Sequence, residues 1–228
     1  MLNVTLFWSF RSPYSYVVLP RILKLRACHG VNIDLRIVHP AAIRNPAYFN
    51  RMDPLARPYF FRDTARVAAF HGLSFRRPVP DPIVQDPVTL RIATDNPLAH
   101  WLGRLGIAAS ERGCGLAFAD EVSRLLWDGR TDNWHKGSHM ADAAQRAGLS
   151  FADLQNAVDA EPGRLEEVLA SNDRALRAAG HWGVPTMVFE GEPFFGQDRF
   201  DHLVWRMAQK GLTWTDGLPA GCASPANM

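Results

Sequence analysis

Residues 2–38, LNVTLFWSFRSPYSYVVLPRILKLRACHGVNIDLRIV, decide the fold. Residues 2–10 and 31–38 alternate apolar and polar side chains and are rich in strand-forming residues, so each stretch predicts a β-strand. Between them, Ser12-Pro13 is a helix-start signal, and the predicted helix stops at Gly30. A strand–helix–strand unit of this kind implies a parallel strand pair joined by a right-handed crossover.

The strand pattern returns near the C-terminus. Thr186–Glu190 and Phe194-Phe195 predict two short strands around a Gly-Glu-Pro turn, and residues 198–210 predict a last helix. Neither end of the chain is long enough to bury a core alone, so we expect both ends to form one four-stranded mixed sheet. This α/β arrangement is that of thioredoxin, with a large all-helical insertion between the two halves.

The insertion carries apolar side chains at helical spacing. The expected organisation is a thioredoxin-like domain from residues 1–40 plus 181–212, a helical domain over 41–180, and a tail over 213–228. The helices expected within the insertion lie near residues 59–71, 88–110, 115–128, 135–147, 151–159 and 163–179.

The 228-residue chain has the composition of a globular protein. Hydrophobic residues make up 47% and charged residues 21%, which excludes a collagen-like or disordered chain. No apolar run approaches the ~18 residues of a membrane-spanning helix, and the opening residues lack the features of a secretory signal. Cys28, Cys114 and Cys222 are too few and too widely spaced for a disulfide framework or a zinc knuckle. We therefore expect a cytoplasmic protein with no membrane partner.

Charge is distributed unevenly along the chain. Residues 1–80 carry 12 basic and 3 acidic side chains, a net of +9, whereas residues 81–228 carry 13 and 20, a net of −7. A basic first third attracts anions, so it forms either a solvated basic face or a cleft for small acids or a carboxylate-bearing cofactor. The basic residues are dispersed rather than clustered, which argues against a nucleic-acid partner.

The first chemical candidate is Ser12-Pro13-Tyr14-Ser15, where the first strand turns into the first helix. In a thioredoxin fold a redox C-x-x-C pair lies here, and serines stand at both cysteine positions. The opening turn of a helix presents unpaired N–H groups and a positive dipole end, which stabilise a nearby anion. A hydroxyl there can donate to the thiolate of a bound molecule and lower the pKa of that thiol. Ser12 is therefore either a helix cap alone or a cap that also binds a ligand's sulfur.

Two further candidates follow the helical segment. Gly183-Val184-Pro185-Thr186 places a proline before an inner strand, although proline cannot donate to the sheet. The proline is either an ordinary strand-edge residue or the cis proline that faces the first helix in thioredoxin-like folds. Gln197-Asp198 is either a helix cap or a pair that binds a ligand's ammonium group. Trp182 suits an aromatic pocket wall or the core equally well.

A family resemblance is carried by three stretches together, FWSFRSPYSYVVLPRI, WDGRTDNW and HWGVPTMVFEGEPFFGQDRFDHLVWRM. They resemble the 2-hydroxychromene-2-carboxylate isomerases, which are relatives of the kappa-class glutathione transferases and, more distantly, of periplasmic disulfide oxidoreductases. The resemblance covers most of residues 3–210. It implies a thioredoxin-like domain with a helical insertion, a homodimer and bound glutathione.

The resemblance also implies roles for individual residues. Ser12 would face the glutathione sulfur, Val184 would pair its backbone with the cysteinyl unit, and Gln197 and Asp198 would hold the γ-glutamyl end. The residues expected at the glutathione site are Ser12, Pro13, Tyr14, Asn45, Val184, Pro185, Gln197 and Asp198.

This chain departs from the family pattern on the substrate side. The family has an acidic residue and phenylalanine shortly before the active serine, whereas this chain has Ser9-Phe10-Arg11, which adds a cation beside the thiol site. The family's asparagine after the second strand best matches Asn45, with Asn50 as the alternative, and its basic residue matches Arg57. Arg11, Arg57 and Trp182 are therefore the expected substrate contacts.

The resemblance implies a glutathione-dependent cis–trans isomerase of a 2-hydroxychromene-2-carboxylate-type aromatic acid, with Ser12 as the catalytic residue. Two alternatives remain open: a kappa-like glutathione transferase or peroxidase, and a non-catalytic thioredoxin-like binding protein. No metal site is expected. His135 and His139 are four residues apart with Asp142 nearby, but one such pair around Gly137 is weak evidence for a ligand set.

Overall fold

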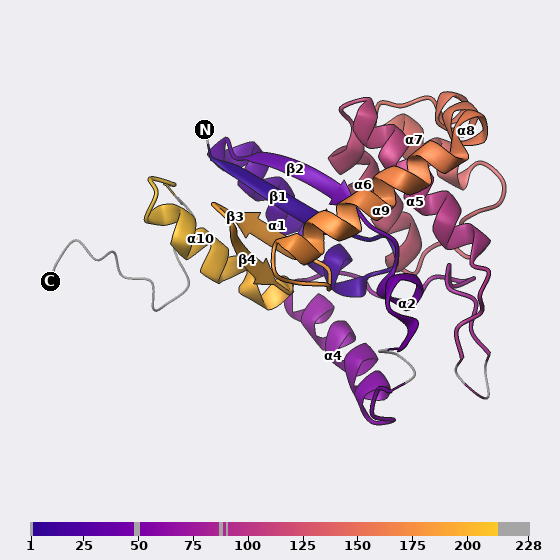
Figure 1. Ribbon diagram of the computed structural model, residues 1–228, viewed down its shortest axis with the longest axis horizontal. Helices are drawn as coiled ribbons and strands as arrows, with labels where there is room; N and C mark the ends of the chain where they lie inside the picture. The colour runs from indigo at the N-terminus through magenta and orange to yellow at the C-terminus, as the bar shows by residue number, and fades with distance from the viewer. Residues whose placement is uncertain (1, 48–50, 87–88, 90, 214–228) are drawn as a thin grey trace, which may run out of the picture.

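The computed structural model describes residues 2–47, 51–86, 89 and 91–213, and its centre is a four-stranded mixed sheet (Figure 1). The strands run in the order β2-β1-β3-β4, with β1 and β2 parallel and the other two pairs antiparallel. This confirms the predicted thioredoxin-like sheet built from both ends of the chain. The four strands are β1 (Asn3–Trp8), β2 (Asn32–Ile37), β3 (Thr186–Phe189) and β4 (Glu192–Phe195).

Strand β1 holds the centre of the sheet because it is apolar on both faces. Leu6 pairs with Leu35 of β2 on one side and with Met187 of β3 on the other. Leu6 and Trp8 are completely buried, and so is Met187. A strand covered on both faces reads as a continuous hydrophobic run, which is what LFW provides.

The first helix, α1 (Pro13–His29), begins and ends where the sequence signals predict. Ser12 is its N-cap, in an extended conformation, and its side chain accepts a hydrogen bond from the backbone N–H of Ser15. Gly30 ends the helix in a left-handed conformation (φ 62°), which a glycine adopts without steric cost. The cap fixes Ser12 at the edge of the sheet, where β1 ends.

The inserted segment forms helices around one end of the sheet (Figure 1). They are α2 (Ala41–Arg44), α4 (Ala56–Phe70), α5 (Pro97–Glu111), α6 (Gly115–Trp127), α7 (His139–Arg146), α8 (Phe151–Ala160) and α9 (Pro162–Ala178). Helix α4 packs against α1, whereas α9 packs against both α5 and β2 and so connects the helical cluster to the sheet.

Two of the expected helices begin later than the apolar spacing predicts. The helix expected over 88–110 begins at Pro97, because Ile92, expected within it, forms a β-bridge with Gln85 instead. The helix expected over 135–147 begins at His139, after Gly137 adopts a positive φ of 59°. In both cases local turn chemistry interrupts a pattern that periodicity alone treats as continuous.

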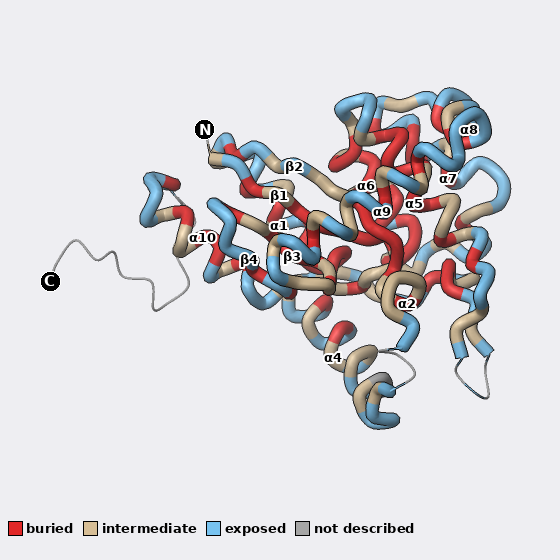
Figure 2. Tube along the Cα trace, in the orientation of Figure 1, coloured by how far each residue is buried: buried red, intermediate tan, exposed pale blue. Residues whose placement is uncertain are grey.

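One hydrophobic cluster runs from the sheet into the insertion (Figure 2). Phe10, just beyond β1, packs edge-on against Trp8 and against Phe118 of α6. The indole N–H of Trp127, at the end of α6, donates to the Phe10 carbonyl at 2.9 Å. The insertion is therefore joined to the sheet by a shared core, and the division into two domains stays a prediction.

The chain returns through β4 and a short 3₁₀ turn, η1 (Gln197–Arg199), to a last helix, α10 (Phe200–Ala208). The expectation that Asp198 begins this helix is wrong by two residues, and neither segment has a side-chain cap. The reason is that the turn after Gly196 closes with 3₁₀ bonding before the α-helical bonding begins. Within the described residues, no helix has the length and apolar character needed to cross a membrane.

Candidate functional site

The opening turn of α1 meets the loop before β3. The Ser12 hydroxyl donates to the Val184 carbonyl oxygen at 3.3 Å while accepting from the N–H of Ser15 at 3.2 Å. The Val184–Pro185 peptide bond is cis. The two segments, 172 residues apart, come together because β1 and β3 are neighbours in the sheet.

A pocket of about 450 Å³ opens beside this contact. Small-molecule sites commonly have volumes of about 300–1,000 Å³, so its size suits a cofactor, a substrate or both. Its wall combines the start of α1, the segments around α2 and α4, the loop before β3, and Ile83, Gln85 and Ile92. The polar and aromatic lining, together with the residue before Pro185, includes Arg11, Ser12, Tyr14, Tyr59, Phe60, Phe61, Trp182, Val184 and Phe195.

Aromatic rings line the pocket from several directions: they come from α1, from α4, from the loop before β3 and from β4. Tyr14 packs edge-on against Phe60 with ring centroids 5.1 Å apart. Of the described residues on the wall, Arg11 alone is charged. A flat aromatic molecule with one acidic group matches this combination of rings and a single cation.

Tyr14 connects the opening turn of α1 to α4. Its hydroxyl donates to an Asp63 carboxylate oxygen at 2.6 Å. Burial, together with this hydrogen bond, raises the pKa of Tyr14 well above its ordinary value. The phenol therefore stays protonated and acts as a donor that holds α4 against the pocket.

Stacked rings close the pocket beside Val184. The ring of His181 lies parallel to that of Phe195 at 3.8 Å and to that of Trp182 at 5.8 Å. Burial lowers the pKa of His181, and its Nδ1 accepts from the Gly183 N–H at 2.8 Å, a bond that requires this nitrogen to be unprotonated. A Cβ on Gly183 would lie 2.5 Å from the Phe195 ring, so only glycine permits this stacking.

Several residues expected at the site lie on the pocket wall, whereas others do not. Arg11, Ser12, Pro13, Tyr14, Trp182 and Val184 line it. Asn45 ends α2, and Pro185 is buried behind Val184, so neither is among the lining residues. The side chain of Arg57, like all of Asn50, lies outside the described residues.

The two residues expected at the γ-glutamyl end also lie off this wall. The Gln197 side chain hydrogen-bonds to His71 after α4, and the Asp198 side chain is 59% exposed beside Arg199. The pKa of His71 is lowered, chiefly by burial and by the nearby Arg21 guanidinium, although the Gln197 bond opposes the decrease. Roles for Gln197 and Asp198 in ligand binding stay predictions.

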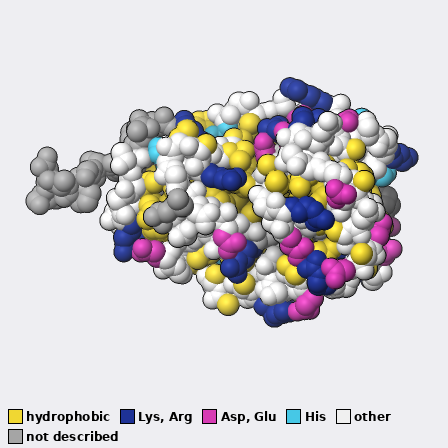
Figure 3. Space-filling view, turned by 90° about the horizontal axis from the view of Figure 1, so that it is seen from above, with side chains coloured by type: hydrophobic (Ala, Val, Ile, Leu, Met, Phe, Trp, Pro, Cys, Tyr) yellow, Lys and Arg dark blue, Asp and Glu magenta, His cyan; other side chains and the backbone are white. Residues whose placement is uncertain are grey.

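The uneven charge of the chain is largely balanced in three dimensions. Arginines of the basic first third pair with carboxylates of the acidic remainder: Arg11 with Asp81, Arg21 with Asp201, Arg44 with Asp173, and Arg76 with Asp132. Basic and acidic side chains are interspersed on the face shown in Figure 3. The excess of positive charge along the first 80 residues therefore does not translate into one basic cleft.

A histidine cluster that sequence inspection missed lies at the base of the insertion. His39 Nε2 and His100 Nδ1 lie 2.6 Å and 3.0 Å from the two carboxylate oxygens of Glu166. The three groups are close enough together to suggest a metal site, but the distances are those of hydrogen bonds, and Arg104 Nε lies 3.4 Å from the same carboxylate. The cluster therefore acts as a bridge between the end of β2, α5 and α9.

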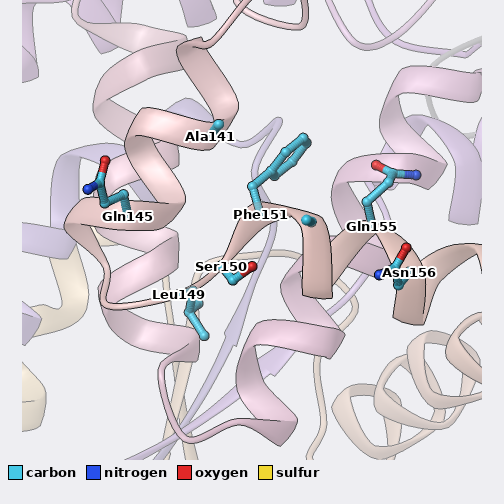
Figure 4. A pocket seen from close by; sticks show the side chains of 8 residues that line it. Ala141, Gln145, Leu149, Ser150, Phe151, Gln155 and Asn156 are labelled. Carbon is cyan, nitrogen blue, oxygen red and sulfur yellow. The ribbon is translucent and has the colours of Figure 1, made fainter.

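A second hollow lies between α7 and α8 and is lined by Gln145, Leu149, Phe151, Gln155 and Asn156, among others (Figure 4). It has a volume of about 610 Å³ and a mainly apolar floor. Its described lining carries no charged or nucleophilic group beyond the Ser150 hydroxyl, which accepts from the Asp153 N–H to cap α8. The pocket beside Ser12, in contrast, is lined by a hydroxyl, a guanidinium and several aromatic rings.

The family model of the DSBA-like thioredoxin domain matches residues 3–208, so the chain belongs to this family. No curated protein sequence matches the chain. The matched residues include Ser12 and Ser15 at the opening turn of α1.

Solved structures resemble the whole chain. The protein is similar to a 2-hydroxychromene-2-carboxylate isomerase, with a TM-score of 0.70 and 19% identity over 92% of this chain and 96% of that chain. A probable DsbA oxidoreductase from Streptomyces coelicolor gives 0.63 and 18% over 96% and 95%. The cytosolic disulfide reductase DsbM from Pseudomonas aeruginosa with GSH gives 0.58 and 18% over 92% and 100%. At these low identities, the TM-scores show a shared fold and no more.

Proposed function

We propose that this protein is a glutathione-dependent cis–trans isomerase of a 2-hydroxychromene-2-carboxylate-type aromatic acid. The observation that carries the proposal is the replacement of the C-x-x-C pair by Ser12-Pro13-Tyr14-Ser15 at a turn that faces the cis Pro185 loop. A site of this kind has the surroundings that stabilise a thiolate but no thiol of its own. It suits a nucleophile brought in by a bound molecule.

The opening turn of α1 fits a thiolate. Pro13 at the first helical position has no N–H, and the N–H groups of the first turn have no intrahelical acceptors, so the turn carries a partial positive charge. The Ser12 hydroxyl is partly exposed to the pocket and makes only a long bond to Val184. It can rotate to donate to a sulfur anion, which lowers the pKa of the corresponding thiol.

The residues proposed to hold glutathione lie at this turn and in the facing loop, where Val184 would pair its backbone with the cysteinyl unit. Gln197 and Asp198, beyond β4, are proposed to bind the γ-glutamyl end. When bound, the glutathione thiolate supplies a nucleophile that adds reversibly to the conjugated double bond, so that the bond can rotate before the thiolate leaves. Ser12 stabilises the thiolate, and the aromatic wall orients the substrate ring and excludes water. Neither oxidant nor reductant is consumed.

The aromatic acid assignment rests on the lining of the pocket. Rings from Tyr14, Phe60 and Trp182 offer stacking surfaces, and Arg11 offers a cation for the carboxylate. The likeness to the solved 2-hydroxychromene-2-carboxylate isomerase supports the same choice. The structure of DsbM with GSH supports glutathione as the thiol.

Thiol oxidoreductase activity, which the dithiol relatives suggest, is disfavoured by the two serines. A kappa-like transferase or peroxidase would use the same pocket and is separated from an isomerase by stoichiometry. A transferase consumes one glutathione for each product, whereas an isomerase consumes none. We further propose, from the family resemblance, that the protein acts as a cytoplasmic homodimer.

The deciding experiment follows the ultraviolet spectrum of 2-hydroxychromene-2-carboxylate with the protein, with and without glutathione, while free glutathione is measured before and after. Glutathione-dependent isomerisation with no loss of glutathione is expected. Spectral change with equimolar loss of glutathione would indicate a transferase. No isomerisation under either condition, despite glutathione binding by calorimetry, would refute the isomerase proposal.

A further inference from the structure

Arg11 is clamped by a buried carboxylate. Its Nε and Nη2 donate to the two oxygens of Asp81 at 2.8 Å and 2.7 Å, a bidentate contact along one side of the guanidinium. Both side chains are largely buried, with exposed fractions of 16% for Arg11 and 17% for Asp81. The plane of the guanidinium also lies near the Trp127 ring, 5.8 Å from its centroid.

The clamp occupies only part of the guanidinium. An arginine carries five N–H donors in a rigid planar fork, and the bidentate contact uses the side formed by Nε and Nη2. The end formed by Nη1 and Nη2 is a second pair of parallel donors with the spacing of a carboxylate. Arg11 lines the pocket, and in the described part of the chain its side-chain hydrogen bonds go to Asp81 through Nε and Nη2 and none through Nη1.

Asp81 is itself held from two other directions. Arg77 Nη2 donates to it at 2.8 Å, and the Ile83 N–H donates at 3.0 Å. The guanidinium of Arg77 stacks over the ring of Phe61, a pocket residue, at 4.4 Å. Two arginines around one carboxylate leave a net positive charge of one, which is the charge needed to balance a single carboxylate of a ligand.

We propose that Arg11, held along one side by Asp81, binds a carboxylate of an aromatic ligand with its free end, and that Asp81 is a positioning residue for this contact. The inference rests on the proposed function for the aromatic acid, but it concerns recognition rather than turnover. Fixing the fork in advance reduces the conformational entropy that a flexible arginine would lose on binding. It also places the cation beside aromatic walls where water is scarce, so the charge-assisted bonds are strengthened.

The test uses 2-hydroxycinnamate and its methyl ester as probes, with binding to the full-length protein measured by isothermal titration calorimetry. The two probes share the ring and the double bond and differ in one negative charge. The unmodified protein is expected to bind the acid at least tenfold more tightly than the ester. Arg11→Gln should abolish most of that preference. Asp81→Asn releases the guanidinium but adds one positive charge, so it should lower the preference by a smaller factor, and both variants should keep the affinity for the ester within about twofold.

The matched control is Asp120→Asn. Asp120 has an 18% exposed side chain, close to that of Asp81, and pairs with Arg124 at 2.7 Å on α6, so its substitution removes a partly buried carboxylate charge away from the pocket wall. This variant should keep the preference for the acid. Arg11→Lys, which keeps the charge but not the planar fork, should retain only part of it.

Several results would overturn the inference. They are an unmodified protein that binds acid and ester equally, an Asp81→Asn variant that keeps the full preference, or one that loses affinity for both probes alike. If Asp81→Asn fails to fold, the test is the acid preference of Arg11→Lys, and a full preference in that variant would contradict a role for the planar fork. Glutathione-dependent isomerisation without any acid preference would refute only the role of Arg11 and Asp81. An acid preference without isomerisation would refute only the proposed function.

Discussion

Ser12 Oγ lies 3.3 Å from the carbonyl oxygen of Val184, so the hydroxyl that caps α1 also touches the residue before the cis proline. The hydroxyl thus has two structural roles: it accepts from the Ser15 N–H as a cap, and it donates to Val184 as a cross-link. A ligand sulfur that attracts the hydroxyl proton must replace the longer of these two contacts. Binding of a thiolate at Ser12 would therefore break one long hydrogen bond, the one from Ser12 to Val184.

Replacing Ser12 by alanine should separate these roles. Loss of the cap is expected to lower the free energy of unfolding by about 1 kcal/mol, because the Ser15 N–H loses its acceptor. Loss of the donor should reduce isomerisation by about 10²-fold or more and raise the pH at which activity appears, because the thiolate is less stabilised. Urea unfolding and a pH–rate profile measure the two effects. An active Ser12→Ala with an unchanged profile would assign Ser12 to capping alone.

Much of this site is visible in the sequence because it lies at element boundaries. Ser12-Pro13 is a helix-start signal, and Val184-Pro185 precedes a strand, so the sheet order alone brings them together. The aromatic wall from α4 was not predicted. Tyr59, Phe60 and Phe61 are consecutive, so helical spacing alone does not place all three at one site, and only the packing of α4 on α1 shows that they line the pocket.

The pairing of carboxylates with distant side chains could not be predicted from the sequence either. Asp81 lies in a proline-rich loop with no periodic signal, and its pairing with Arg11 spans 70 residues. The link between His39 and Glu166 spans 127 residues. Periodicity reports which face of an element is buried, but it carries no information about which distant polar group will meet it there.

Substituting Gly183 by alanine should disrupt the ring stack beside Val184. The new Cβ would lie 2.5 Å from the Phe195 ring, within a stack that includes His181 at 3.8 Å. Overpacking of this kind is expected to cost about 1–3 kcal/mol and to weaken glutathione binding, because the loop that carries Val184 must move. Thermal unfolding and calorimetry with glutathione provide the measurements.

Gly163→Ala is the matched control for that substitution. Gly163 lies in the first turn of α9, has no positive φ, and has no heavy atom within 4 Å of an added Cβ. The alanine is expected to leave glutathione binding unchanged and to stabilise the protein by about 0.5–1 kcal/mol. Equal effects of the two substitutions would contradict a specific role for the Gly183 stack.

The Glu166 bridge should make stability depend on pH in the acid range. Burial raises the pKa of Glu166, but the hydrogen bonds and charges of His39 and His100 outweigh it, and the pKa lies below its ordinary value. The unfolded chain therefore binds the proton more readily, so this contribution to stability is present above the ordinary pKa of glutamate and is lost as pH falls through the lowered pKa.

Glu166→Gln tests that linkage. At pH 7 the substitution should cost about 1–3 kcal/mol, the usual effect of removing hydrogen bonds to a charged group. Urea unfolding from pH 7 down to pH 3.5 should show the difference between the two proteins shrinking toward the acid end. A difference that stays constant over this range would show that the carboxylate charge does not contribute.

The bond between Tyr14 and Asp63 should control how firmly α4 closes the pocket. Tyr14→Phe keeps the ring that faces Phe60 but removes the 2.6 Å hydrogen bond to the carboxylate. Because α4 supplies much of the aromatic wall, we expect KM for the aromatic acid to rise several-fold while kcat changes little. Asp63→Ala should have the same effect, and the double variant should be no worse than either single one, with a coupling energy of about 1 kcal/mol in a double-mutant cycle. Additive losses in that cycle would mean that each side chain acts separately and that the hydrogen bond does not position α4.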